Sequence, residues 1–304
     1  MELFDFIHQK IIKTHRYTLA VAVAQDHDVL SAVTRAVSMR LIDAILVGDE
    51  AKINTVAQAH NLPLANCTIL HEPDGVLACE KAVRLVSSGE AQILMKGLID
   101  TSILLKAVLN KEWGLRTGQV LSHVTVASVP GYEKLFLISD AAMNIAPDLA
   151  AKKQIIENCL PVANALGIYT PKVAVVCAVE KVNPKMIATL DAQALSEMQK
   201  RGEITGCEVD GPFAFDNAVS VLAAKHKGIE NPNAGKADIL LMPTIEAGNI
   251  LYKAVTFFAH GSVACMISGA KAPIVLTSRA DTDDDKLNSI ALSVLMAGKL
   301  NSSN

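Results

Sequence analysis

The residues best suited to chemistry lie near the end of the chain, between a short apolar run and a helix. Pro273–Leu276 is long enough for a buried strand, and the mostly apolar Ile290–Ala297 is typical of a packed helix. Open α/β sheets place ligand sites at the carboxyl ends of strands, which is where this stretch lies. Its hydroxyl, guanidinium and carboxylate side chains are Ser278, Arg279, Asp281, Thr282, Asp283, Asp284 and Asp285.

The same stretch contains a helix-start signal. Thr282 followed three residues later by Asp285 is a capping-box pattern, which predicts that the helix begins at Asp283. The helix dipole favours acidic residues in a first turn, so a solvated turn with no chemical role explains the same residues. This stretch alone does not decide between a ligand site and a solvated turn.

The elements that must position these side chains alternate along the chain. Strand-like runs occur at Thr18–Ala24, Ala44–Val47, Thr68–Leu70, Gln92–Met95, Lys172–Val179, Ile239–Met242 and Val263–Ile267. Helix-like stretches occur at Asp28–Met39, Glu50–His60, Gly75–Ser87, Thr101–Leu109, Ala150–Leu166, Pro184–Lys200, Asn217–His226 and Ala247–His260. The alternation predicts an α/β fold of mostly parallel sheets with helices on both faces.

The alternation is interrupted in the middle of the chain. Gln119–Val129 alternates apolar and polar residues, Pro130-Gly131 makes a turn and Lys134–Ile138 resumes, which predicts an antiparallel pair. A domain boundary is predicted near this pair. The last strand and helix cannot form a core of their own, so they should return to the first domain. The predicted domains are therefore 1–128 plus 268–304, and 129–267.

Composition restricts the class of protein. A chain of 304 residues with 51% hydrophobic content is long enough for two buried cores. A net charge of −3 gives no electrostatic reason to expect nucleic acid or an anionic membrane surface as a partner. No apolar window is long enough to span a membrane, and no signal peptide is recognised. Six cysteines without a C-x-x-C pair predict free thiols and a reducing cytoplasm.

Several catalytic motifs are absent from the sequence. No G-x-G-x-x-G follows a strand, and no P-loop, H-E-x-x-H or G-x-S-x-G pattern occurs. The eight histidines lack metal-ligand spacing, so we expect neither a metal nor a permanently bound cofactor.

Three pairs of polar junctions remain, most of them after a strand and before a helix. They are Met95–Thr101 with Leu115–His123, Asp140–Pro147 with Gly211–Ala218, and Pro243–Tyr252 with Thr277–Asp285. Helix N-termini and Gly-rich turns present backbone N–H groups, so we expect these junctions to bind anions.

The motifs at these junctions carry a family resemblance. GPFAFDNA at Gly211–Ala218, the Gly248-Asn249 step followed by Tyr252-Lys253, and Ser278-Arg279 with Asp285 occur in a specific order and spacing. On these residues the chain resembles the phosphate acyltransferase family, which comprises phosphate acetyltransferases and phosphate butyryltransferases. The resemblance covers essentially the whole chain.

Two further stretches resemble the butyryltransferase branch. They are MKGLIDT, in which Lys96 stands where acetyltransferases tend to carry a small residue, and LRTGQVLSHV. In Asp140-Ala141-Ala142-Met143-Asn144, Ala141 occupies the position of a cysteine in the acetyltransferases. The resemblance therefore implies no catalytic cysteine here.

The resemblance implies an acyltransferase that moves a short acyl group, butyryl or similar, between coenzyme A and inorganic phosphate. The transfer is direct, in a ternary complex, with acyl-CoA, acyl phosphate and phosphate as partners and no covalent acyl-enzyme. The implied fold is of the isocitrate/isopropylmalate dehydrogenase type, with two α/β domains, a cleft between them and a homodimer or higher homo-oligomer.

The resemblance also implies roles for named residues. Asp285 corresponds to the general base that takes the thiol proton, and Ser278 and Arg279 to the pair that stabilises developing charge. Candidate substrate-binding residues at the junctions are Lys96, Gly97, Lys106, Arg116, His123, Asn144, Asp216, Gly248 and Asn249. Surface charge explains Lys106 and Arg116 equally well, and turn chemistry explains Asn144, Asp216 and Asn249 equally well.

The proposed base and its thiol are mismatched in acidity. An aspartate of pKa about 4 facing a thiol of pKa about 8.5 differs by about 4.5 units, roughly 6 kcal/mol. A helix N-terminus would lower the aspartate's pKa further. Either burial raises the pKa of Asp285, or Arg279 lowers the pKa of the thiol by stabilising the thiolate, or both occur, and we favour the role of Arg279.

Three other functions remain open. A phosphate acetyltransferase would differ only in its acyl pocket. A decarboxylating hydroxy-acid dehydrogenase of the same fold would need metal-binding aspartates and a nicotinamide pocket, for which the sequence has no signature. A non-catalytic CoA-binding protein would not need Ser278, Arg279 and Asp285 together.

Overall fold

The chain folds into two compact units. The structure is a computed structural model that describes residues 2–11, 16–278 and 281–301. One unit contains residues 1–119 and 263–304, and the other contains residues 120–262. The domain limits given above, at 128 and 267, remain a prediction.

The strands of the first unit follow the order β3-β2-β1-β4-β11-β10. Their bounds are β1 (Tyr17–Ala22), β2 (Ile42–Gly48), β3 (Cys67–His71), β4 (Ile93–Lys96), β10 (Ser262–Ser268) and β11 (Ile274–Val275). Neighbours from β3 to β11 are parallel, and β10 is antiparallel to β11. The parallel arrangement places the carboxyl ends of β1, β4 and β11 side by side.

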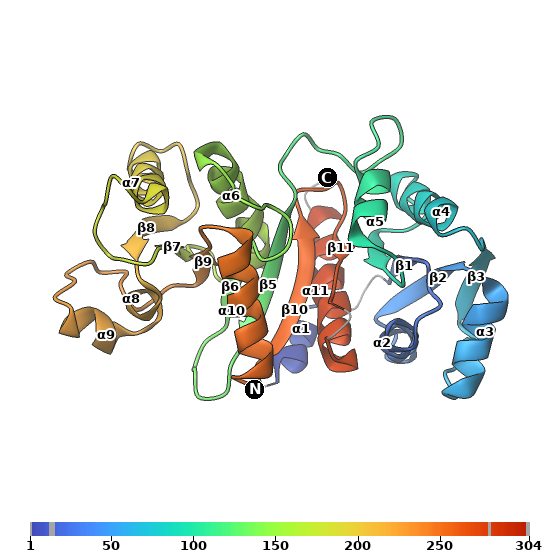
Figure 1. The fold of residues 1–304 in the computed structure, drawn as a ribbon. Helices are drawn as coiled ribbons and strands as arrows, with labels where there is room; N and C mark the ends of the chain where they lie inside the picture. Colours follow the sequence, from blue (N-terminus) through green and yellow to red (C-terminus); the bar gives the residue numbers. More distant parts are fainter. Residues whose placement is uncertain (1, 12–15, 279–280, 302–304) are drawn as a thin grey trace. The chain divides into compact units, whose positions relative to one another are not determined.

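Helices pack on this sheet from both faces (Figure 1). Helix α2 (His27–Ser38) packs against α11 (Asp283–Asn301), which also contacts α1 (Leu3–Lys10). Helix α4 (Gly75–Ser87) packs on β1 and contacts α5 (Thr101–Val108), while α3 (Glu50–Ala59) precedes β3. One apolar core joins α2 and α11 to the sheet through residues such as Leu30, Leu19, Met95, Ile290 and Val294.

Aspartates begin three of these helices. Asp26, Asp49 and Asp74 are the N-cap residues of α2, α3 and α4, and each side chain accepts a hydrogen bond from a first-turn N–H. An N-cap of this kind satisfies a backbone donor that the helix itself leaves unpaired. The caps fix where the helices of this unit begin, on the side of the sheet where strands end.

The second unit has the strand order β5-β6-β9-β7-β8. Its strands are β5 (Ser122–Ser128), β6 (Phe136–Ser139), β7 (Lys172–Val176), β8 (Glu208–Phe213) and β9 (Ile239–Leu241). The antiparallel pair predicted from the sequence is confirmed, since β5 and β6 pair antiparallel and the others pair parallel. The helices are α6 (Leu149–Ala165), α7 (Ile187–Lys200), α8 (Phe215–Val219), α9 (Val221–His226) and α10 (Ile245–Phe257).

Three predicted helices differ from those observed by more than one residue at an end, one of them because α10 spans Ile245–Phe257 rather than Ala247–His260. The stretch Asn217–His226 contains two helices, because Ser220 has extended backbone angles and its hydroxyl caps α9. Helix α7 begins at Ile187 rather than Pro184, because the residues between them form a turn. The predicted fold class, mixed α/β with mostly parallel strands, is confirmed. Among the helices in the described ranges, none has the length and apolar character that a membrane crossing requires.

Candidate active site

A small cavity lies in the first unit at the ends of β4 and β11. Its volume is about 80 Å³, and we call it the strand-end cavity. Of the predicted site residues, it brings together Lys96, Gly97 and Ser278. The complete lining is Asp26, Asp28, Val29, Lys96, Gly97, Leu98, Thr277, Ser278 and Lys286.

Lys96 and Gly97 form the turn that ends β4. The buried Lys96 Nζ donates to the carbonyl oxygens of Gly97 and Ile99, at 3.2 and 3.0 Å. A Cβ on Gly97 would lie 2.1 Å from the carbonyl oxygen of Val23 and 2.6 Å from that of Ala22. Only glycine allows this close approach to the end of β1, which brings the Lys96 turn against the cavity.

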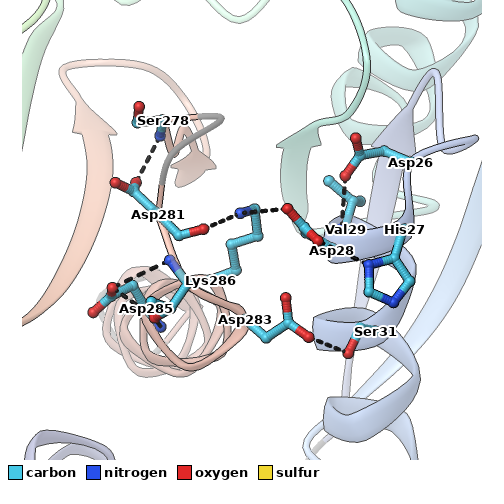
Figure 2. Close-up of polar contacts among 11 residues, drawn as sticks. Asp26, His27, Asp28, Val29, Ser31, Ser278, Asp281, Asp283, Asp285 and Lys286 are labelled. Carbon is cyan, nitrogen blue, oxygen red and sulfur yellow. Dashed lines mark hydrogen bonds and ion pairs between the residues drawn. The ribbon is translucent and has the colours of Figure 1, made fainter.

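Ser278 lies in the turn between β11 and α11, and Asp281 holds its backbone at two points. The Ser278 N–H donates to Asp281 Oδ2 at 2.6 Å, and the Asp281 N–H donates to the Ser278 carbonyl at 3.2 Å. The Asp281 carbonyl accepts a hydrogen bond from Lys286 Nζ at 2.5 Å (Figure 2). Arg279 falls outside the described residues, so its predicted role remains a prediction.

Asp285 forms the capping box that the sequence predicts, and α11 begins at Asp283 as expected. Its N–H donates to Thr282 Oγ1 at 3.1 Å, and its Oδ2 accepts from the Thr282 hydroxyl at 2.7 Å and the Thr282 N–H at 3.4 Å. Its Oδ1 accepts from the N–H of Val263 on β10 at 2.9 Å. A carboxylate has about four acceptor positions, so these donors leave roughly one for another partner.

Burial controls the acidity of Asp285. Loss of solvation raises the pKa of this carboxyl above its ordinary value of 3.8, and this outweighs the lowering by hydrogen bonds from Val263 and Thr282. Of the two alternatives considered from the sequence, burial is therefore supported, because the carboxyl is only 7% exposed. The raised pKa reduces the mismatch with a thiol.

The other carboxylates of this stretch have partners on α2. Asp283 Oδ2 accepts from the Ser31 hydroxyl at 2.5 Å, and Asp284 pairs with Arg35 at 2.8 Å. Asp284 is well exposed, whereas Asp281 and Asp285 are buried. The acidic run is thus an anchored helix start rather than a uniformly solvated turn.

A second group of predicted residues surrounds a turn after β6 in the second unit. The buried Asp140 carboxylate accepts from the backbone N–H groups of Ala142 and Met143, at 2.8 and 2.9 Å. It also accepts from Asn144 Nδ2 at 2.5 Å, and the same amide donates to the Leu121 carbonyl at 2.8 Å. Asn144 therefore holds the turn in shape.

Helix α10 supplies the other two members of this group. A Cβ on Gly248 would lie 2.1 Å from the Asp140 carbonyl oxygen, so a larger residue cannot pack there. Asn249 Nδ2 donates to the Ala141 carbonyl at 3.2 Å. Asn144, Gly248 and Asn249 thus lie around one turn.

Four predicted binding residues are not among those that line the strand-end cavity. His123 is buried in β5, where its ring contacts the Thr125 hydroxyl and Tyr252. Asp216 is half exposed and pairs with a surface lysine of the same unit. Lys106, in the last turn of α5, and Arg116, in the following loop, are both exposed.

Sequence reasoning missed three charged residues of the cavity, namely Lys286, Asp28 and Asp26. For Lys286 a signal was available. It lies four residues before Ile290 and eight before Val294, on the stripe of α11 that packs into the core. A lysine on a buried stripe needs a polar partner, which makes it conspicuous.

The cysteines are free thiols, and most of them are buried. Burial raises the pKa of Cys79, Cys177 and Cys207 to about 11 each, and that of Cys159 to about 12. Such groups are protonated at neutral pH and are poor nucleophiles. Within the described ranges, no group of three or more His, Cys, Asp or Glu side chains is placed to hold a metal ion.

The chain is similar to known proteins over most of its length. The sequence profile described as "Phosphate acetyl/butaryl transferase" matches residues 74–294. A phosphate butyryltransferase of Clostridium beijerinckii is 47% identical over 97% of this chain and 98% of its own length. A phosphate acetyltransferase of Thermotoga maritima is 49% identical over 92% of this chain and 95% of its own length.

Solved structures agree with the sequence matches. A branched-chain phosphotransacylase from Enterococcus faecalis V583 aligns with a TM-score of 0.82 at 36% identity, covering 92% of this chain and 99% of that one. A putative 4-hydroxythreonine-4-phosphate dehydrogenase from Salmonella typhimurium shares the fold, with a TM-score of 0.57 at 12% identity over 93% of this chain and 99% of that one. The fold is thus an α/β fold found in both acyltransferases and dehydrogenases. The chain belongs to the phosphate acetyl/butyryl transferase family.

The raised pKa of Asp285 predicts a pH-dependent stability difference. The folded state holds the Asp285 proton more tightly than the unfolded state, so this group adds stability as the pH falls through its raised pKa toward 3.8. Asp285→Asn lacks this proton equilibrium. The melting temperature of the wild type minus that of Asp285→Asn should therefore be larger at about pH 4 than at about pH 7.

Both proteins should be melted in the same buffers, so that all other titrating groups cancel in the difference. A difference that is constant with pH, or that shrinks on acidification, would show that burial does not raise this pKa.

Proposed function

We propose that this chain is a phosphate butyryltransferase. It transfers a short acyl group reversibly between coenzyme A and inorganic phosphate, by direct attack of the CoA thiolate or of phosphate within a ternary complex. Coenzyme A acts as a substrate, and no cofactor stays bound. The observation that carries this proposal is near full-length similarity, at 47–49% identity, to two proteins named phosphate butyryltransferase and one named probable phosphate butyryltransferase.

The local chemistry supports an acyl transfer without a covalent enzyme intermediate. Cys79, Cys159, Cys177 and Cys207 are protonated thiols at neutral pH, and the family resemblance implies that Ala141 stands where the acetyltransferases have a cysteine. Asp285 is the proposed base for the CoA thiol, helped by a pKa that burial raises. Ser278 and Arg279 are proposed to stabilise charge on the transferring group.

We assign phosphate to the strand-end cavity. A cavity of about 80 Å³ exceeds the space one water needs and suits a single small oxyanion. Lys96, which carries an ammonium group, and Ser278 both line this cavity. Asn144 in the turn after β6, and Gly248 and Asn249 of α10 packed on that turn, are proposed to contact substrate.

Phosphate acetyltransferase is the second candidate. This candidate is supported because the Thermotoga maritima protein named phosphate acetyltransferase is as similar in sequence to this chain as the butyryltransferases are. The two activities differ in the acyl group, so a comparison of acyl chains distinguishes them.

The purified protein should make acyl phosphate from butyryl-CoA and phosphate, and thioester from butyryl phosphate and CoA. Each extra buried methylene stabilises binding by about 0.8 kcal/mol, so two should favour butyryl over acetyl by on the order of tenfold in kcat/KM. Thioester formation from both acyl phosphates is the measurement. Equal or better use of acetyl phosphate would assign the acetyltransferase, and no thioester from either would end the family-based proposal.

Asp285→Asn tests the proposed base. The amide keeps the size of the side chain and an acceptor for the Val263 N–H, but it cannot take a proton. We expect kcat to fall by about 10²–10⁴-fold with KM for CoA nearly unchanged. The matched control is Asp284→Asn, which changes an exposed aspartate beside it on the same helix turn. A variant that keeps more than half of the wild-type turnover would remove Asp285 from the mechanism.

We propose a homodimer formed through an apolar groove of the second unit. The groove has a volume of about 390 Å³ and is lined by side chains of β6, α8, α10 and the adjoining loops. Among the lining residues, Phe258 is 86% exposed. A two-fold axis would let this ring enter the groove of a second copy, so that one patch serves both subunits.

Phe258→Glu should convert the dimer to a monomer, because dimerisation would then bury an unpaired carboxylate. Sedimentation at several protein concentrations measures this. Ile187→Glu is the matched control, since Ile187 is 73% exposed in the same unit but does not line the groove. A monomeric wild type, or a Phe258→Glu variant as dimeric as the wild type, would contradict the proposal.

We place the protein in the cytoplasm. All six cysteines are free thiols, as is usual in a reducing compartment.

A further inference from the structure

We infer that Lys286 is a positioning residue for the reaction, acting through Ser278. The inference rests on the proposed function, because it gives Lys286 a role only if Ser278 contributes to the chemistry. Neither the family resemblance nor the comparisons assign any role to Lys286.

Lys286 is connected to Ser278 through a single intervening residue. Its Nζ donates to the Asp281 carbonyl at 2.5 Å, and the Asp281 carboxylate accepts from the Ser278 N–H at 2.6 Å (Figure 2). The Asp281 N–H also donates a hydrogen bond to the Ser278 carbonyl at 3.2 Å. Asp281 therefore grips the backbone of Ser278, and Lys286 fixes the peptide that carries Asp281.

The Lys286 ammonium is itself held in place. Its side chain is 3% exposed and begins in the first turn of α11, whose apolar stripe is packed in the core. Asp28 of α2 lies 3.7 Å away and supplies a compensating charge, and it also contacts His27 at 2.9 Å. A buried ammonium group can hold a turn rigidly when its side chain starts from a packed helix and a counter-charge lies nearby.

Simple attachment of α11 to α2 does not require this lysine. The Asp283–Ser31 hydrogen bond and the Asp284–Arg35 ion pair already join the same two helices. The hydrogen bond of Lys286 differs from these contacts because it goes to the Asp281 carbonyl in the turn before α11 rather than to α2. Its specific effect should therefore be on the placement of Ser278.

A double-mutant cycle tests this inference. The variants are Lys286→Met, Ser278→Ala and the double variant, with kcat, KM for phosphate and KM for acyl-CoA measured for each. Met keeps the length and apolar stem of lysine but loses the donor, and Asp28 is exposed enough to remain hydrated without its partner. A misplacement of about 1 Å at a reacting group can lower the rate by on the order of 100-fold.

We expect Lys286→Met to lower kcat by about 10- to 100-fold with both KM values within about threefold of wild type. In the Ser278→Ala background, Lys286→Met should lower kcat by less than about threefold, because residues that act through one another are not additive. Arg35→Met is the matched control, since it cuts another contact between the same helices and should lower kcat by less than about twofold.

Two outcomes would overturn the inference. If KM for phosphate rises while kcat is unchanged, Lys286 binds phosphate directly. If the losses in kcat multiply in the double variant, Lys286 acts independently of Ser278. An inactive wild type would instead reject the proposed function. A fully active Ser278→Ala would reject a role for Ser278 in it.

A second variant covers poor folding of Lys286→Met. Asp281→Ala breaks the same connection at the carboxylate that holds the Ser278 N–H. It should show the same fall in kcat and the same lack of additivity with Ser278→Ala. Losses in kcat that multiply in the double variant of Asp281→Ala and Ser278→Ala would overturn the inference as well.

Discussion

The need to pair buried charge shapes the start of α11, and the rest of the site depends on it. A carboxylate or ammonium removed from water destabilises the fold unless it finds a partner. Asp281, Asp285 and Lys286 are all buried, and each has a polar contact. These contacts place one turn between β11 and α11, where the chain would otherwise have freedom.

Steric exclusion complements this charge pairing. At Gly97 and at Gly248, the position that a Cβ would occupy is already filled by a backbone carbonyl. The first contact brings the end of β4 against the end of β1, and the second brings α10 against the turn after β6. Each unit thus forms its polar turn by an approach that only glycine permits.

Local patterns in the sequence predicted local structure well. The capping box of Thr282 and Asp285, the helix start at Asp283 and the antiparallel pair of β5 and β6 depend on neighbours within a few residues, so a pattern can specify them. The α/β class follows from the alternation of strands and helices. The prediction of a single helix over Asn217–His226 was wrong because a serine that caps one helix can interrupt a stretch that looks continuous in sequence.

The candidate site was only partly predictable, since its contacts join distant parts of the chain. Lys96, Gly97 and Ser278 were found because they follow strands, but the pairing of Lys286 with Asp28 joins the two ends of the sequence. His123 was expected near the first polar junction. The structure buries it in β5, where neighbouring polar residues such as Ser122 and Thr125 are buried as well. The stretch alternates apolar and polar residues as a half-exposed strand does, so its pattern gave no sign that the polar side is buried as well.

The burial of the cysteines has a consequence for chemical selectivity. An acyl phosphate is an acylating agent, and any thiolate of the protein could be modified by it. With a pKa of about 11, Cys79, Cys177 and Cys207 are ionised at neutral pH to only about one part in ten thousand. A protein that brings an activated acyl group to a thiol is thereby protected from acylation at these three cysteines, because their sulfur atoms are both enclosed and protonated.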